Sequence, residues 1–115
     1  MGALDPAAHA EAELAIESVT IVDAIQGARP NHRVVVRGEQ IVWVGPMSAG
    51  GPSAAQTVDG SGRILIPGLW DAHVHFVYDE ELTEAMPDLF LDWGITSVRD
   101  TGGDLDQLVA LRTRW

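Results

Sequence analysis

Two segments with the character of strands, residues 69–76 and the β-branched residues 95–99, are separated by a long connection that itself has helical character. The connection, residues 77–94, is too long for a tight hairpin. It is long enough for the crossover that joins parallel strands, which takes a dozen or more residues. This part of the chain is therefore predicted to alternate strands and helices, and residues 69–76 are expected to form a buried strand.

The connection and the segment after the second strand each predict helix. Residues 79–93 have helical character but contain Pro87. Because proline is poorly tolerated inside a helix, we expect two helical pieces that meet there. Gly94 is expected to end the second piece. Asp104 is expected to cap a last helix that runs to about residue 113, so that residues 69–113 read as β-α-β-α.

The N-terminal half has the pattern of a small all-β unit. Short β-branched runs alternate there with Gly- and Pro-containing breaks, as is typical of strands and turns. A loop is expected at residues 26–31, where Gly27 and Pro30 occur. The expected strands are residues 14–22, a hairpin of 33–36 with 41–44, and short strands at 57–59 and 63–66.

The character of the chain changes at Pro67-Gly68, which divides it into three predicted parts. Residues 1–13 are predicted to be a tail, rich in alanine and acidic residues. Residues 14–66 are the β unit, and residues 67–115 are the β-α-β-α part.

Composition excludes several classes of partner. The chain has 7 basic residues, all arginine, and 17 acidic residues, for a net charge of −10. Nucleic acids and anionic membranes are recognised through clustered positive charge, so neither is expected as a partner. There is no cysteine, which excludes disulfides and thiolate metal ligands. No secretory signal or membrane-spanning run is visible, and we expect a cytoplasmic location.

The chemistry is concentrated in residues 69–76, where His73 and His75 alternate along the predicted strand. Alternate side chains share a face, so the two imidazoles are expected about 6.6 Å apart along one face. Their nitrogens can converge on one metal ion at about 2.0–2.1 Å each. Asp71 is expected on the same face, where it can hold a ligand in place. Residues 70, 72, 74 and 76 are expected to face a helix layer. The alternative is an ordinary imidazole pair bonded to backbone or water.

Further residues near the strand ends each allow two interpretations. Arg99 and Asp100 either line a pocket or form a structural ion pair or loop anchor. Gly102 and Gly103 either accommodate a substrate or supply a turn with positive φ. The acidic residues 79–81 either reach the metal or form a solvated first helical turn that complements the helix dipole.

Four segments together carry a resemblance to a known family. They are the strand end at 20–23, the hairpin at 34–45, the run 58–75, and residues 94–103. The most specific part of them is Pro67-Gly68-Leu69-Trp70-Asp71-Ala72-His73-Val74-His75. In these features the chain resembles the N-terminal part of the metal-dependent amidohydrolase superfamily, especially its imidazolonepropionase-like and prolidase-like branch.

The resemblance implies a mixed α and β fold: a small β-sandwich unit followed by the first two β/α units of an incomplete (β/α)8 barrel. It implies that His73 and His75 end the first barrel strand and bind the more buried metal, usually zinc, in a site that holds one or two ions. It also implies hydrolysis of amide-like or ester-like bonds by a metal-activated water. The substrate would be a small amide, cyclic amide or dipeptide.

The family's other metal ligands and its catalytic base come from later strands, which this chain lacks. We therefore expect the 115-residue chain alone to be catalytically incomplete. The alternative is a non-catalytic folded fragment or assembly partner, completed by another chain or by self-association, because an incomplete barrel exposes strand edges and apolar faces.

Overall fold

The computed structural model describes residues 12–115, and it is a mixed α/β structure made mostly of strands. It divides into two compact units, one ending at Pro67 and the other beginning at Gly68. Most of the predicted tail, including residues 1–11, lies outside the described residues. The first strand begins at Ala12, shortly before the boundary expected for the β unit.

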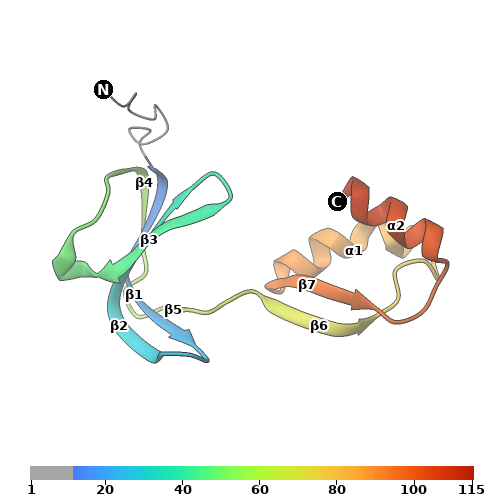
Figure 1. Ribbon diagram of the computed structural model, residues 1–115, viewed down its shortest axis with the longest axis horizontal. Coiled ribbons are helices and arrows are strands. Elements are labelled where there is room, and N and C mark those ends of the chain that lie inside the picture. Colours follow the sequence, from blue (N-terminus) through green and yellow to red (C-terminus); the bar gives the residue numbers. More distant parts are fainter. Residues whose placement is uncertain (1–11) are drawn as a thin grey trace, which may run out of the picture. The chain divides into compact units, whose positions relative to one another are not determined.

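The first unit is one five-stranded sheet (Figure 1). Its strands pair in the order β3-β2-β1-β4, and β5 also pairs with β1. A short 3-10 helix, Met47–Ala49, follows β3. The strands are β1 (Ala12–Asp23), β2 (Gly27–Arg37), β3 (Gln40–Pro46), β4 (Ala54–Asp59) and β5 (Ile64–Leu65).

The long strand β1 changes partner along one edge. Its first half pairs in parallel with β4, and its second half pairs in parallel with β5. Between the halves Ser18 has a φ of 57°, and the pairing of β1 with β2 shifts there, as in a β-bulge. Gly60, at the turn from β4 to β5, donates its N–H to the carbonyl of Glu17 at 2.7 Å. A Cβ at Gly60 would lie 2.8 Å from that oxygen, so the close approach requires glycine.

The predicted hairpin is confirmed, because β2 and β3 pair antiparallel with Val34 opposite Val44. The predicted loop at 26–31 is wrong, because β2 already begins at Gly27. A paired strand tolerates Pro30 here because the register is irregular: Asn31 has a φ of 53°, and the pairing shifts on the β1 side.

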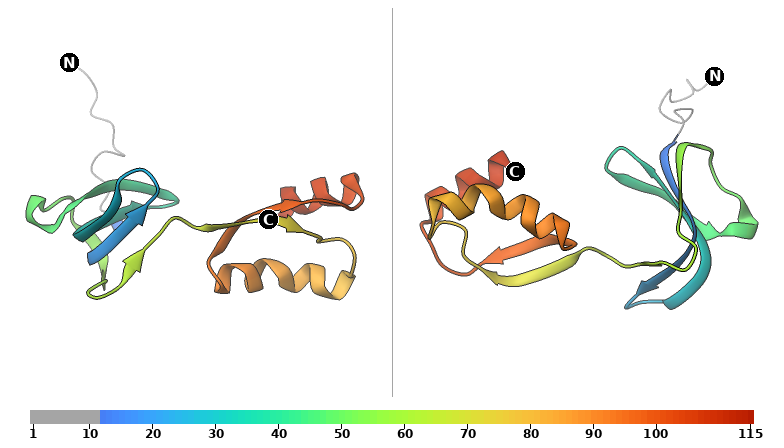
Figure 2. Two further views of the ribbon diagram at one scale, coloured as in Figure 1. Left: turned by 90° about the horizontal axis from the view of Figure 1, so that it is seen from below. Right: turned by 180° about the vertical axis from the view of Figure 1, so that it is seen from behind.

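The second unit contains β6 (Leu69–Val74), α1 (Glu80–Asp92), β7 (Ile95–Asp100) and α2 (Leu105–Arg114). The parallel pairing of β6 with β7 confirms the crossover expected from the long connection. Both helices lie on one side of the two strands (Figures 1 and 2). A Cβ at Gly68 would collide with the side chain of Thr96, so the start of β6 lies very close to β7.

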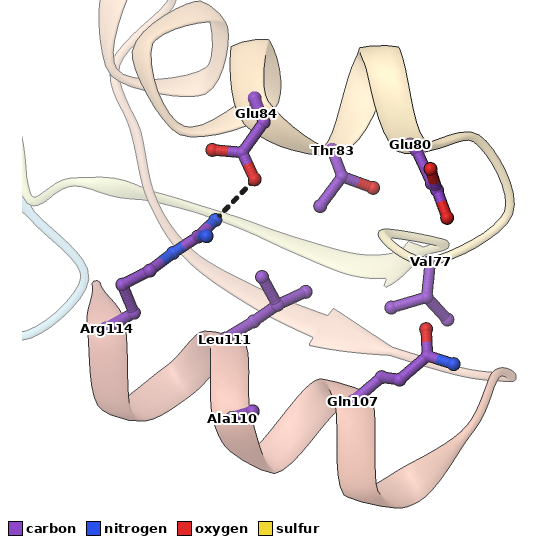
Figure 3. A pocket seen from close by; sticks show the side chains of 8 residues that line it. All are labelled: Val77, Glu80, Thr83, Glu84, Gln107, Ala110, Leu111 and Arg114. Atoms are coloured by element: carbon purple, nitrogen blue, oxygen red, sulfur yellow. Dashed lines mark hydrogen bonds and ion pairs between the residues drawn. The ribbon is translucent and has the colours of Figure 1, made fainter.

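Phe76, just beyond β6, forms the centre of the second unit's core. It is only 6% exposed, and its ring lies 5.7 Å from that of Phe90 and 5.3 Å from that of Trp115. Beside this core a pocket opens between α1 and α2, where Arg114 and Glu84 form an ion pair at 2.7 Å (Figure 3). The lining of that pocket includes neither imidazole.

Two expectations for this unit are wrong. The helix does not break at Pro87, because α1 runs continuously from Glu80 to Asp92. An internal proline removes one hydrogen bond and bends a helix, which a helix held by neighbouring contacts can absorb. Nor is β6 a buried strand: Trp70 is 74% exposed and Leu69 46%. The strand has only one paired neighbour among the described residues.

The helix ends lie at the residues that the sequence predicted for them. Asp104 caps α2 by accepting a hydrogen bond from the N–H of Gln107 at 2.9 Å, as expected. Gly94 follows α1 with a φ of 76°, the left-handed conformation that commonly ends a helix. Within residues 12–115, no helix is long and apolar enough to cross a membrane.

Candidate metal centre

The structure brings His73 and His75 together at the end of β6. Their Nε2 atoms lie 3.3 Å apart, and the two rings meet edge to face, with centroids 5.1 Å apart. Phe76 packs on α1 and α2, whereas the imidazoles contact each other. The two nitrogens therefore lie at hydrogen-bonding distance from each other, a separation at which the pair can share either one proton or one metal ion.

The separation of the two nitrogens suits a tetrahedral metal ion. Two ligands held about 2.0–2.1 Å from such an ion, at the tetrahedral angle, lie about 3.3–3.4 Å apart. The Nε2 atoms of His73 and His75 are 3.3 Å apart. The donor set, two neutral imidazoles, is one that zinc favours. The residues present therefore fit two positions of a zinc-like site.

A carbonyl group sets the protonation pattern of His75. Its Nδ1 lies 3.2 Å from the carbonyl oxygen of Gly102. A carbonyl can only accept a hydrogen bond, so Nδ1 is the donor and carries the proton. In the neutral ring Nε2 then presents a lone pair, the form that a metal ligand needs.

Asp100 joins the loops that follow the two parallel strands. Its Oδ2 accepts a hydrogen bond from the backbone N–H of Phe76 at 2.8 Å, and its Oδ1 accepts one from the N–H of Gly102 at 2.9 Å. The N–H of Thr101 also donates to the carbonyl of Val74 at 3.1 Å. Of the two readings for Asp100, this geometry supports the loop anchor. Arg99, its neighbour on β7, is exposed.

The strand is irregular beside Asp71, and simple alternation fails there. The pairing with β7 shifts between Asp71 and Val74. Val74 is buried, as expected for the helix-facing side, but Ala72 and Trp70 are exposed. The expected apolar face thus forms only in its second half. Asp71 contacts His73 through the backbone, accepting a hydrogen bond from its N–H at 3.1 Å.

The acidic residues after the histidines begin α1. Asp79 is the N-cap and accepts hydrogen bonds from the N–H groups of Glu81 and Leu82. Within residues 12–115, no group of three or more histidine, aspartate or glutamate side chains is placed to hold a metal ion. The geometry thus supports the reading of residues 79–81 as a first helical turn.

Sequence reasoning missed Tyr78. Its ring stacks on that of His75, with centroids 4.6 Å apart and planes inclined by 9°. Gly102 was considered for a positive φ, but that conformation belongs to Gly103, with a φ of 152°. At Gly102 it is the space that is limited, because a Cβ would lie 3.1 Å from the hydroxyl oxygen of Tyr78. The sequence feature that could have indicated the stack on His75 is this aromatic residue, three positions after the second histidine.

Comparison with known proteins finds relatives that match part of the chain. An imidazolonepropionase from Arthrobacter sp. (strain FB24) is 46% identical over 61 residues, which are 53% of this chain and 15% of that protein. An adenine deaminase from Edwardsiella ictaluri is 32% identical over 87 residues, 76% of this chain and again 15% of the relative. The chain thus spans a small part of the length of these curated relatives. No protein-family model matches the chain.

Solved structures that resemble the chain cover a larger share of it. A prolidase complexed with N-methylphosphonate-L-proline superposes with a TM-score of 0.66 and 30% identity, covering 87% of this chain and 28% of the prolidase. An N-acyl-D-glutamate deacylase from Bordetella bronchiseptica, complexed with zinc and a phosphonate inhibitor, superposes with a TM-score of 0.60 and 31% identity. That match covers 77% of this chain and 18% of the deacylase.

The fold and the paired imidazoles define a mixed α/β protein with a candidate histidine metal centre. The relatives and the superposed structures then give its family. The chain belongs to the amidohydrolase superfamily, a superfamily of hydrolases in which use of a divalent metal is established for structural neighbours of this chain.

Proposed function

We propose that this chain supplies the first metal ligands of a zinc-dependent hydrolase. The observation that carries the proposal is the 3.3 Å separation of the Nε2 atoms of His73 and His75, which suits two ligands of one tetrahedral ion. The zinc in the related deacylase supports the choice of metal. The complete enzyme would hold one or two ions.

In this proposal residues 67–115 form the first two β/α units of a (β/α)8 barrel, and residues 14–66 form part of a β-sandwich. The parallel pairing of β6 with β7, with both helices on one side, supports the barrel. The imidazoles lie at the carboxyl end of β6, which is the end where barrel enzymes carry their active sites.

Each residue near the site has a defined task in this proposal. His73 and His75 bind the ion through Nε2, and the carbonyl of Gly102 keeps the proton of His75 on Nδ1. Asp71 holds the backbone of His73, and Asp100 ties the two strand ends together. Arg99 lines the substrate pocket. When bound, a divalent ion supplies Lewis acidity, which polarises a scissile carbonyl and lowers the pKa of water.

The proposed substrate is a small amide, cyclic amide or dipeptide, whose amide-like C–N bond, or a corresponding ester bond, is hydrolysed. The names of the relatives support this class: an imidazolonepropionase, an N-acyl-D-glutamate deacylase, and a prolidase bound to a proline phosphonate.

The chain alone should not turn over such substrates. A catalytic zinc generally has three protein ligands and an open position, and two imidazoles supply only two. Residues 12–115 offer no third group of the required kind beside them. The remaining ligand and the base would come from residues beyond those present here.

The test is zinc-dependent hydrolysis of a panel of dipeptides, lactones and cyclic amides. We expect the 115-residue chain to show none above background. A longer polypeptide that continues it through the remaining barrel units should be active and should lose its activity on His73→Ala or His75→Ala. Robust zinc-dependent turnover by the short chain, lost on His73→Ala, would contradict the expectation that the chain alone is incomplete, whereas an active longer polypeptide that keeps its activity on His73→Ala and on His75→Ala would contradict the metal-ligand proposal.

A second candidate function is assembly with another chain. Among the described residues β6 and β7 form a two-stranded sheet, so each strand has an unpaired edge. Trp70 and Trp93 are 74% and 75% exposed. Open edges and exposed aromatic side chains favour association. Sedimentation velocity tests this candidate: a monomer at all concentrations would contradict self-association.

A further inference from the structure

We propose that Tyr78 is a positioning residue for His75, and that its ring and the carbonyl of Gly102 together hold the imidazole in its metal-binding orientation. The inference rests on the proposed metal centre, which it extends by one residue. Neither the sequence pattern nor the relatives' names assign a role to this tyrosine.

The first support is the geometry of the stack. The rings of Tyr78 and His75 are nearly parallel, inclined by 9°, with centroids 4.6 Å apart. Tyr78 is 68% exposed, so burial of its own ring does not account for its place. The ring contact described for Tyr78 is with the imidazole, and stacked aromatic pairs are attractive beyond the area they bury.

The second support is the tight fit of three groups. A Cβ at Gly102 would lie 3.1 Å from the hydroxyl oxygen of Tyr78 and 3.5 Å from Cε1 of His75. The backbone at position 102 therefore lies against both rings, and its carbonyl accepts the Nδ1–H of His75. Glycine leaves room for the tyrosine to lie flat on the imidazole.

The two contacts restrict different motions. The hydrogen bond from Nδ1 fixes the direction of the ring within its plane and selects the tautomer, but it permits tilting about its own axis. The stack resists that tilt because it needs parallel planes. Together they keep Nε2 of His75 directed at Nε2 of His73, where an ion would bind.

The direct test is the tautomer of His75 in the metal-free 115-residue chain, measured by long-range ¹H–¹⁵N correlation at a pH where the ring is neutral. Wild type should show the Nδ1–H form. Tyr78→Ala should raise the share of the Nε2–H form, whereas Tyr78→Phe, which keeps the ring, should match wild type. An unchanged tautomer in Tyr78→Ala would overturn the proposal. If Tyr78→Ala loses its fold by circular dichroism, Tyr78→Leu, which keeps apolar bulk without a ring, decides in its place.

Titration with Co²⁺ separates this proposal from the metal centre on which it rests. Loss of the stack should weaken Co²⁺ binding by about 2- to 10-fold, and Tyr78→Phe should restore it. Trp93→Ala, which removes another exposed aromatic ring, is the matched control and should bind as wild type does. Weaker binding in His73→Ala but not in Tyr78→Ala would overturn the positioning role and leave the metal centre standing. Binding that His73→Ala does not change would refute the metal centre, while the tautomer would still decide the role of Tyr78.

Discussion

Asp100 joins the two strand ends that carry the candidate site, and its removal should loosen both. Its carboxylate accepts two backbone hydrogen bonds, from Phe76 at 2.8 Å and from Gly102 at 2.9 Å. Hydrogen bonds to a charged group contribute about 1.5–3 kcal/mol each. Because Asp100 is only half-buried, solvent replaces part of that energy. We therefore expect Asp100→Ala to lower the free energy of unfolding by about 2–4 kcal/mol.

Asp100→Asn should cost less, because its amide oxygen can still accept from one N–H while its NH2 group faces the other. The measurements are urea unfolding and hydrogen exchange at the amides of Phe76 and Gly102, which should lose protection in Asp100→Ala. Asp88→Ala removes an exposed carboxylate from α1 and serves as the control. Wild-type exchange at both amides, together with an unchanged unfolding midpoint, would refute the reasoning.

Three further predictions concern single side chains. Pro87→Ala should stabilise the chain by about 1–3 kcal/mol in thermal unfolding, because it restores a helix hydrogen bond inside α1; a lower melting temperature would contradict this. Asp79→Ala should cost about 1 kcal/mol in urea unfolding, since it removes the cap of α1, and an unchanged midpoint would show that the cap contributes nothing. Backbone hydrogen bonds from Gln26 and Ile25, with the nearby Arg29, hold the pKa of Asp23 below its ordinary 3.8, so its contribution to stability is present above that pH and is lost as the pH falls through the folded-state value. Asp23→Asn should therefore flatten the acid side of the stability profile measured by urea unfolding, and a profile as steep as wild type would count against it.

The sequence correctly predicted the elements that depend on residues within them or next to them. The hairpin of β2 and β3, the parallel crossover from β6 to β7 and the Asp104 cap each follow from turn residues, connection length or a capping side chain. These signals hold because the interaction that decides each element lies within or beside it.

Elements decided by distant neighbours could not be predicted in this way. Whether Pro30 lies in a loop or in a strand depends on its pairing with β1, and that pairing depends on bulges at Ser18 and Asn31. Similarly, the continuity of α1 through Pro87 depends on the packing that holds the helix on both sides of it.

The sequence predicted that the two imidazoles lie together, but it did not predict what surrounds them. Alternation predicted that His73 lies beside His75, and the two rings are in contact, although β6 ends at Val74 and His75 lies just beyond it. It fails for Asp71, because the register shifts between that residue and Val74. The carbonyl of Gly102 and the ring of Tyr78 approach His75 through the folding of two separate loops, and no spacing in the sequence encodes either contact.

X-ray absorption on the zinc-loaded 115-residue chain tests the central claim most directly. We predict one zinc ion per chain, bound more weakly than in a site with all its protein ligands, with two imidazole nitrogens at about 2.0–2.1 Å and water completing the shell. Substitution of either His73 or His75 by alanine should remove one of the two imidazole contributions from the spectrum. Zinc bound with the same spectrum after both histidines are replaced would contradict the account, since the metal would then be held elsewhere.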